Sequence, residues 1–119
     1  MPHVDRKVIE VDADGTPVGR LATRIAMILM GKHKADYDPA RDTGDRVAVK
    51  NLSKIVFTGK KWDQKKHFST SNRPGGLKVM PVKVLRETRP EVILIHAVKY
   101  MLPKNRTQAL RMKRLTFVK

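Results

Sequence analysis

One segment of the sequence, residues 16–31, limits the possible folds more than any other. Its apolar residues recur at offsets of 0, 3, 4, 7, 8 and 11, the spacing of one continuous helical face: Val18, Leu21, Ala22, Ile25, Ala26 and Leu29. Thr16 predicts the start because threonine caps helices, Pro17 suits the first helical position, and Gly31 predicts the end. Such a helix must bury its apolar face against another layer of structure.

Short apolar stretches on either side of this helix predict the layer that it covers. We expect strands at Val8–Val11, Arg46–Lys50, Ile55–Thr58 and Leu115–Val118, and a further short strand at Lys65–Ser69. A helix between the first two strands is typical of parallel neighbours, which need a crossover connection. The 119 residues are therefore predicted to form one α/β domain, residues 1–119, with a short, mostly parallel four-stranded sheet.

The second half of the chain is predicted to be mainly helical, with helices at Val82–Arg86, Val92–Met101 and Arg106–Lys113. Thr88 and Glu91 have the spacing of a capping box before the second of these helices. Pro103 should stop that helix, and Asn105 should cap the third. Asn72–Gly76 concentrates residues that break regular structure, so it is predicted to be a loop.

Charge divides the sequence into two unlike halves. The chain carries 26 Lys and Arg against 11 Asp and Glu, a formal charge of +15. Residues 1–59 hold 10 basic and 8 acidic side chains, whereas residues 60–119 hold 16 and 3. A small domain with such an excess repels itself unless a polyanion neutralises it, so the second half is predicted to bind nucleic acid. Aromatic residues make up only 5%, which argues against base stacking as the main mode of binding.

Basic residues gather in four places that are candidates for contact with RNA. These are Arg20, Arg24, Lys32, His33 and Lys34 in and after the first helix; Lys60, Lys61, Lys65 and Lys66 around Trp62; Arg73 before two glycines; and Lys104, Arg106, Arg111, Lys113 and Arg114 in a tail without acids. Trp62 either stacks on a base or ribose or covers the sheet edge. Gly75 and Gly76 either let the backbone approach a phosphate or simply form a tight turn.

Motifs for catalysis, metals and cofactors do not stand out. The glycines of Asp14–Gly19 are four apart, unlike the dinucleotide fingerprint, and Lys32 and Lys60 follow a glycine without the rest of a phosphate-binding loop. The acidic run Asp36–Asp45 lacks the spacing of a calcium loop, so turn formation and capping are the preferred roles. The chain has no cysteine, and its histidines never stand at ligand spacing. We therefore expect no catalytic residue, no metal, no cofactor and no small-molecule substrate.

Two other classes of function stay open. An RNA-processing enzyme would use the acidic run, including Asp42 and Asp45, to hold a metal, and a free regulator would bind DNA or RNA with the basic half. No stretch approaches the roughly 18 apolar residues of a membrane-spanning helix, and Met1–Lys7 lacks the apolar part of a secretory signal. We expect no membrane partner and a reducing compartment, the cytoplasm or the interior of an organelle.

Nine short blocks of the sequence occur in the order found in one known family. They are Val11–Ala13, Gly19–Ala22, Gly31–Lys34, Gly44–Asp45, Thr58–Lys61, Pro74–Lys78, Arg89–Glu91, Ala97–Val98 and Met101–Asn105. In these blocks the chain resembles the universal ribosomal protein family thirteen of the large subunit. The resemblance implies a three-layer α/β/α sandwich, and RNA-facing positions that include Gly75, Gly76, Lys78 and Asn105.

The same resemblance implies a biological setting. It places the chain in a ribosome, cytoplasmic or organellar, bound to large-subunit rRNA of the 23S type and next to other large-subunit ribosomal proteins. It implies a role early in subunit assembly and in translation, without catalysis and without a cofactor.

Overall fold

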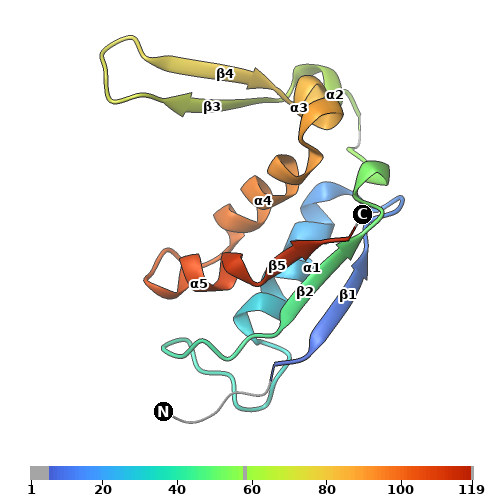
Figure 1. The fold of residues 1–119 in the computed structure, drawn as a ribbon, viewed down its shortest axis with the longest axis vertical. Coiled ribbons are helices and arrows are strands. Elements are labelled where there is room, and N and C mark those ends of the chain that lie inside the picture. The colour runs from blue at the N-terminus through green and yellow to red at the C-terminus, as the bar shows by residue number, and fades with distance from the viewer. Residues whose placement is uncertain (1–5, 58, 119) are drawn as a thin grey trace.

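Within residues 6–57 and 59–118, which the computed structural model describes, a parallel three-stranded sheet forms the centre of the protein (Figure 1). The strand order is β1 (Val8–Asp12), β2 (Arg46–Lys50) and β5 (Leu115–Phe117). Ile9 lies opposite Val47, which in turn lies opposite Leu115. All three strands of this sheet, and β3 (Lys66–Thr70) outside it, agree with predicted strands to within a residue at their ends. Helix α1 (Val18–Met30) makes the predicted crossover from β1 to β2.

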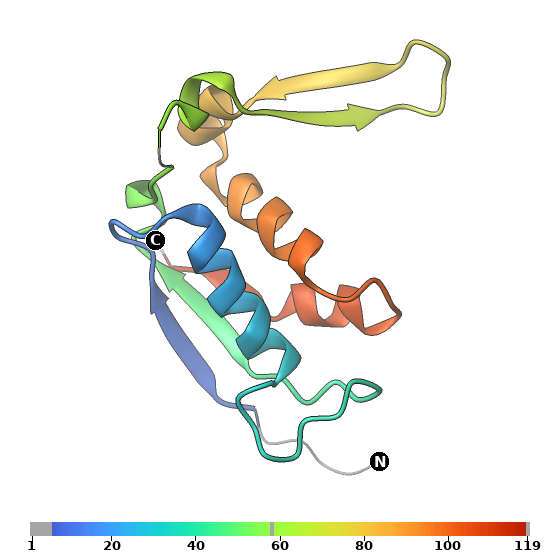
Figure 2. The same cartoon turned by 180° about the vertical axis from the view of Figure 1, so that it is seen from behind.

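Helix α1 covers one face of the sheet, and its apolar stripe forms the core together with that face (Figure 2). Val11, Val47 and Val49 are buried there, and helix α4 (Pro90–Met101) packs beside α1. On the opposite face Glu10 and Thr116 are exposed, and no helix within the described ranges lies over them (Figure 1). The mixed α/β class is confirmed, but the helical layer is on one side, so the predicted three-layer sandwich is wrong.

The predicted strand at Ile55–Thr58 does not form, and the sheet within the described ranges therefore has three strands instead of four. A short 3-10 helix, Leu52–Lys54, precedes this segment, and Thr58 lies outside the described residues. Val56 makes an isolated parallel bridge with Pro17: its N–H donates to the Thr16 carbonyl, and its carbonyl accepts from the Val18 N–H. Pairing ends there because the neighbouring chain turns into α1 at Val18.

The start of α1 differs from the prediction, whereas its end agrees. Pro17 is the residue before the helix, and the Thr16 hydroxyl donates to the Asp14 carbonyl instead of capping the helix. The first helical N–H, that of Val18, is satisfied by the Val56 carbonyl. Gly31 ends the helix as predicted, in the left-handed conformation, with its N–H directed at the last carbonyls.

The second half contains the predicted helices and two elements that the sequence patterns did not predict. The elements are α2 (Lys61–Gln64), β3 (Lys66–Thr70), β4 (Leu77–Pro81), α3 (Val82–Thr88), α4 and α5 (Thr107–Lys113). Strand β4 and the short helix α2 were not expected. The predicted capping box does not form, because the Thr88 hydroxyl donates to the Val84 carbonyl and α4 begins at Pro90. Asn105 does serve α5: its side-chain oxygen accepts the Thr107 N–H.

Strands β3 and β4 form an antiparallel hairpin that projects from the body of the protein (Figure 1). The base of the hairpin is held by a hydrogen bond from the Val82 N–H to the Lys65 carbonyl. There the imidazole of His67 stacks on that of His96 in α4, with 4.1 Å between ring centroids and 20° between ring planes. Beyond this point the side chains of the hairpin are largely exposed, including the apolar Phe68 and Leu77.

Two arginines join the C-terminal segment to the connection that precedes β2. Arg114 donates from Nη1 to Asp42 Oδ2 at 2.5 Å and from Nη2 to the Leu29 carbonyl at 2.8 Å. Arg111 is only 1% exposed; its Nε lies 3.8 Å from Asp42 Oδ1, and its Nη2 donates to the Arg41 carbonyl. The expectation that Arg111 and Arg114 face RNA is therefore wrong. A buried guanidinium needs a counter-charge, and Asp42 supplies it.

Replacing Asp42 by Asn should lower the free energy of unfolding by about 3 kcal/mol, because removing one member of a buried ion pair leaves the other charge unmatched. Urea denaturation followed by circular dichroism measures the loss. The matched control is Asp38→Asn, since that carboxylate is 46% exposed and lies 3.8 Å from Arg41; it should change stability by less than about 1 kcal/mol. Equal losses in the two variants would contradict the role assigned to Asp42.

The stacked histidines should make stability depend on pH. Burial lowers the pKa of His96, and Lys65 and Lys99 lower it further; burial, then His96 and Lys65, lower the pKa of His67. Both imidazoles thus bind protons less readily in the folded chain than in the unfolded chain. The free energy of unfolding should be highest above about pH 6.5 and should fall as the pH drops below that value.

A variant that carries His67→Asn and His96→Asn checks this pH dependence. Between pH 7.5 and 5, the midpoint of its thermal unfolding should fall less than that of the parent chain. The carboxylates titrate at lower pH, so they add little to the difference in this window. If parent and variant lose stability in parallel, the histidine stack is not the cause.

Candidate nucleic-acid interface

The basic cluster after α1 is partly turned inward. His33 Nε2 lies 2.7 Å from Asp45 Oδ2, and Lys34 Nζ lies 2.9 Å from Asp45 Oδ1. Burial by itself raises the pKa of the Asp45 carboxyl, but the hydrogen bonds from Lys34 and His33 outweigh it and lower that pKa. His33 and Lys34 thus anchor the turn after α1 through Asp45, although His33, like Lys32, is exposed. Of the three residues predicted to contact RNA here, Lys32 is therefore the best placed to do so.

Helix α1 presents its polar side to solvent. Arg20 and Arg24, one turn apart, are exposed on the side opposite the buried stripe. This side of α1 is turned toward the viewer in Figure 2. The two guanidinium groups are therefore placed as the sequence predicted, on an accessible helical face beside α4.

The segment around α2 carries four exposed lysines: Lys60, Lys61, Lys65 and Lys66. Trp62 between them is half-buried. The Trp62 ring meets Phe57 edge to face, with 4.7 Å between centroids. The guanidinium of Arg86, a residue of α3, lies 4.3 Å from the centre of the Trp62 ring. These contacts favour a packing role for Trp62 over stacking on a base, because two neighbours already occupy the indole. All four lysines are exposed and can contact phosphate, although Lys65 Nζ also lies 5.2 Å from the centre of the Phe57 ring.

The hairpin carries Arg73 and Lys78, both exposed. At its tip Gly75 adopts a left-handed conformation, with φ of +75°, and the Gly76 N–H donates to the Arg73 carbonyl. A side chain at Gly76 would collide with that of Ser71, so the turn requires glycine there. The geometry accounts for both glycines by the tight turn alone. In this turn the Gly76 N–H is already used in a hydrogen bond within the protein.

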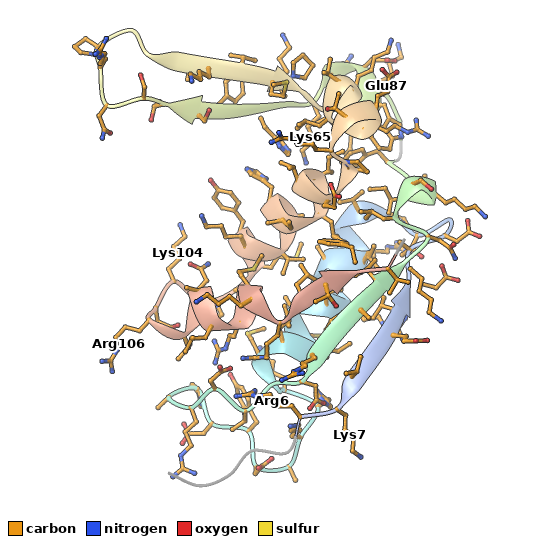
Figure 3. The ribbon with its side chains drawn as sticks, viewed as in Figure 1. Arg6, Lys7, Lys65, Glu87, Lys104 and Arg106 are labelled. Carbon is orange, nitrogen blue, oxygen red and sulfur yellow. The ribbon has the colours of Figure 1, made fainter. Side chains whose placement is uncertain are left out.

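The connection between α4 and α5 projects cations into solvent. Figure 3 shows Lys104 and Arg106 on this connection, pointing away from the body, and Lys65 near the point where the hairpin joins it. Asn105 between them is engaged locally, since its Oδ1 also accepts the Thr107 hydroxyl at 2.6 Å. Lys113 is exposed as well. Asn105 therefore stabilises the connection on which Lys104 and Arg106 are exposed.

Three more exposed cations, Lys83, Arg86 and Arg89, lie on or just after α3. They were not among the predicted positions, although the excess of base over acid in residues 60–119 includes them. They extend the basic surface from the foot of the hairpin along α3. The exposed cations are thus spread over α1, α2, the hairpin, α3 and the α4–α5 connection.

The acidic run offers little support for metal chemistry. Asp42 and Asp45 are occupied by arginine, histidine and lysine partners, while the Asp38 side chain accepts the Ala40 N–H and forms a turn. Across residues 6–57 and 59–118 no group of three or more histidine and carboxylate side chains is placed to hold a metal ion. Over the same ranges, none of the helices combines the length and apolarity needed to cross a bilayer.

Comparison with known proteins agrees with this geometry. Residues 6–119 match the family described as ribosomal protein L13. The chain is 54% identical over 113 residues to the protein named large ribosomal subunit protein uL13 of Thermotoga petrophila, covering 95% of this chain and 76% of that one. The proteins of the same name from Caldanaerobacter subterraneus and Natranaerobius thermophilus are 52% and 50% identical, over 94% and 96% of this chain and 78% and 80% of theirs. The chain therefore belongs to the ribosomal protein L13 family.

Proposed function

We propose that this protein is a structural, non-catalytic constituent of the large ribosomal subunit in the cytoplasm, where it binds large-subunit rRNA. The observation that carries the proposal is the exposure of most cations in residues 60–119, Arg111 and Arg114 excepted, in a region with 16 basic and only 3 acidic side chains. Relatives named as large-subunit proteins, at 50% identity and above, support the same setting. No cofactor is part of the proposal.

The proposed mechanism is architectural. Lysines and arginines neutralise phosphates, which reduces the repulsion between RNA segments and releases counterions. The cations lie on separate elements of a molecule that measures 46 × 37 × 23 Å, so one molecule would engage several RNA segments at once. Recognition would follow the shape of the RNA more than its base sequence. Holding several segments together in this way would favour an early role in subunit assembly.

The proposed phosphate contacts are the exposed members of the predicted set: Arg20, Arg24, Lys32, Lys60, Lys61, Lys65, Lys66, Arg73, Lys78, Lys104, Arg106 and Lys113. The other members shape the surface: Trp62 packs, Gly75 and Gly76 form a turn, and His33, Lys34 and Asn105 hold their local chain. We propose that residues 1–119 act as one domain. The exposed apolar side chains of the hairpin, Phe68, Leu77 and Val79, support contact with neighbouring ribosomal proteins.

Replacing two exposed lysines should weaken RNA binding and should make the affinity less dependent on salt concentration. We expect Lys60→Ala with Lys66→Ala to reduce the slope of log affinity against log salt by about 2, because each lysine accounts for about one phosphate contact. Titrations of large-subunit rRNA at several KCl concentrations measure the slope. The control is Lys50→Ala with Lys54→Ala, since these lysines pair with Glu10 and Asp14. Equal slopes for the two double variants would contradict the proposed surface.

Sedimentation tests the ribosomal setting directly. In sucrose gradients of a cell lysate, the protein should travel with large subunits and translating ribosomes and should stay there after a wash at raised salt, because many phosphate contacts hold it. Immunoblotting of the fractions gives the distribution. A protein confined to light fractions would favour a free regulator. Mg²⁺-dependent cleavage of rRNA by the purified parent chain would favour the processing enzyme, and the absence of cleavage would dismiss it.

A further inference from the structure

A cleft lies between the start of α1, the segment at residues 56–57 and the exposed side of α4. Its volume is about 290 Å³. Val18, Phe57 and Ala97 line its apolar floor, and Lys61 and Lys65 stand at its rim. The volume is at the lower end of the roughly 300–1,000 Å³ typical of sites for small molecules. A cleft of this size admits a single planar group and excludes a duplex.

Aromatic side chains form one wall of the cleft. His96 and Tyr100, one turn apart on α4, lie with their ring centroids 4.6 Å apart and their planes tilted by 51°. Tyr100 is 65% exposed, which is more than is usual for a tyrosine, and it is not part of the core. Lys104 Nζ lies 5.7 Å from the centre of the Tyr100 ring. The wall therefore combines accessible aromatic surface with positive charge at both ends, Lys65 on one side and Lys104 on the other.

The state of His96 suits such a wall. Burial lowers the pKa of His96, with Lys65 and Lys99 lowering it further, so the imidazole is uncharged at neutral pH. His96 is already stacked on His67, so it adds a neutral, partly buried ring to the wall, and the exposed ring of Tyr100 provides the stacking face. The attraction for an anion then comes from the lysines that line the cleft, Lys61 and Lys65.

We propose that this cleft binds an unpaired nucleotide of RNA, with the base stacked on the exposed ring of Tyr100, beside His96, and a phosphate on Lys61 and Lys65. The inference rests on the proposed function and names a site within it. A phosphate alone would leave the apolar and aromatic surface unused, and an apolar peptide would leave the two lysines unmatched. A nucleotide uses both, since proteins that read unpaired RNA stack bases on aromatic rings and pair cations with the backbone.

Nuclear magnetic resonance of the full chain tests the site without rRNA. Adenosine and uridine 5′-monophosphate should shift the methyl signals of Val18, Ala97 and Met101, and Tyr100→Ala should abolish those shifts. Inorganic phosphate should not reproduce them. Equal shifts with inorganic phosphate would reduce the cleft to a simple anion site and overturn the inference. Larger shifts with an acidic aromatic peptide would assign it to a protein partner, and the absence of any shift would refute it.

A binding assay separates this inference from the proposed function. Identical RNA hairpins with one bulged A, C, G or U, or with no bulge, are compared for the parent and for Tyr100→Ala. The parent should prefer a bulged RNA, and the variant should lose about tenfold on it while its affinity for the paired hairpin stays the same. Because Tyr100 is exposed, the variant should keep the circular dichroism of the parent. The exposed apolar control Leu110→Ala should leave both affinities unchanged.

The outcomes of the two assays can be told apart. If Lys60→Ala with Lys66→Ala changes the salt slope but Tyr100→Ala leaves the preference for bulged RNA intact, the proposed function stands and the nucleotide cleft is wrong. If the parent binds no rRNA, the proposed function fails, and the nucleotide titration alone then decides whether the cleft is a site.

Discussion

The carboxylate of Asp42 ties the end of the chain to the connection between α1 and β2. It meets Arg111 in the last turn of α5 and Arg114 in the turn from α5 into β5. The Arg114 carbonyl accepts the Val47 N–H and thereby begins the pairing of β5 with β2. One buried charge thus fixes both the position of the last strand and the course of an otherwise irregular connection. The same connection holds Asp45, which anchors the residues just after α1.

These ion pairs divide the positive charge of the protein into two populations. Arg111 and Arg114 are matched inside, and their charge contributes to the fold. The lysines near α2, the hairpin cations and those of the α4–α5 connection remain exposed. The formal charge of +15 therefore includes two arginines that do not contribute to the exposed basic surface. The acidic run absorbs part of the basic tail, which keeps carboxylates away from the surface that faces the proposed RNA.

Local patterns predicted the parts of the fold that depend on local physics. The apolar spacing of Val18 to Leu29 located α1 because its buried face follows the helical period. Strand β4 was missed because all its side chains but the last are exposed, so Leu77–Pro81 shows no contrast between a buried and a solvent face. Thr16 and Thr88 were wrong as caps, because their hydroxyls found nearby carbonyls instead.

The candidate site was harder to predict than the fold for the same reason. Residue type alone does not say which way a cation points. Arg114 turns inward because it pairs with Asp42. The two residues are 72 positions apart in the sequence, so they come together only in the folded chain. The four lysines of the Lys60–Lys66 segment are exposed, because the segment contains a single acid and offers few partners that would turn them inward. The cleft beside Tyr100 had no signal in the sequence, since α1, residues 56–57 and α4 meet only after folding.

The hairpin contacts the body of the protein only at its base, so its length can change without a change in the body. Each residue removed from both strands near the tip would shorten it by about 3.4 Å without disturbing the core. Removing residues two at a time from each strand would keep the turn facing the same way, because strand side chains alternate between faces with a period of two. The arm can therefore act as a spacer whose length evolves in steps of about 7 Å, while the sheet and its helices stay unchanged.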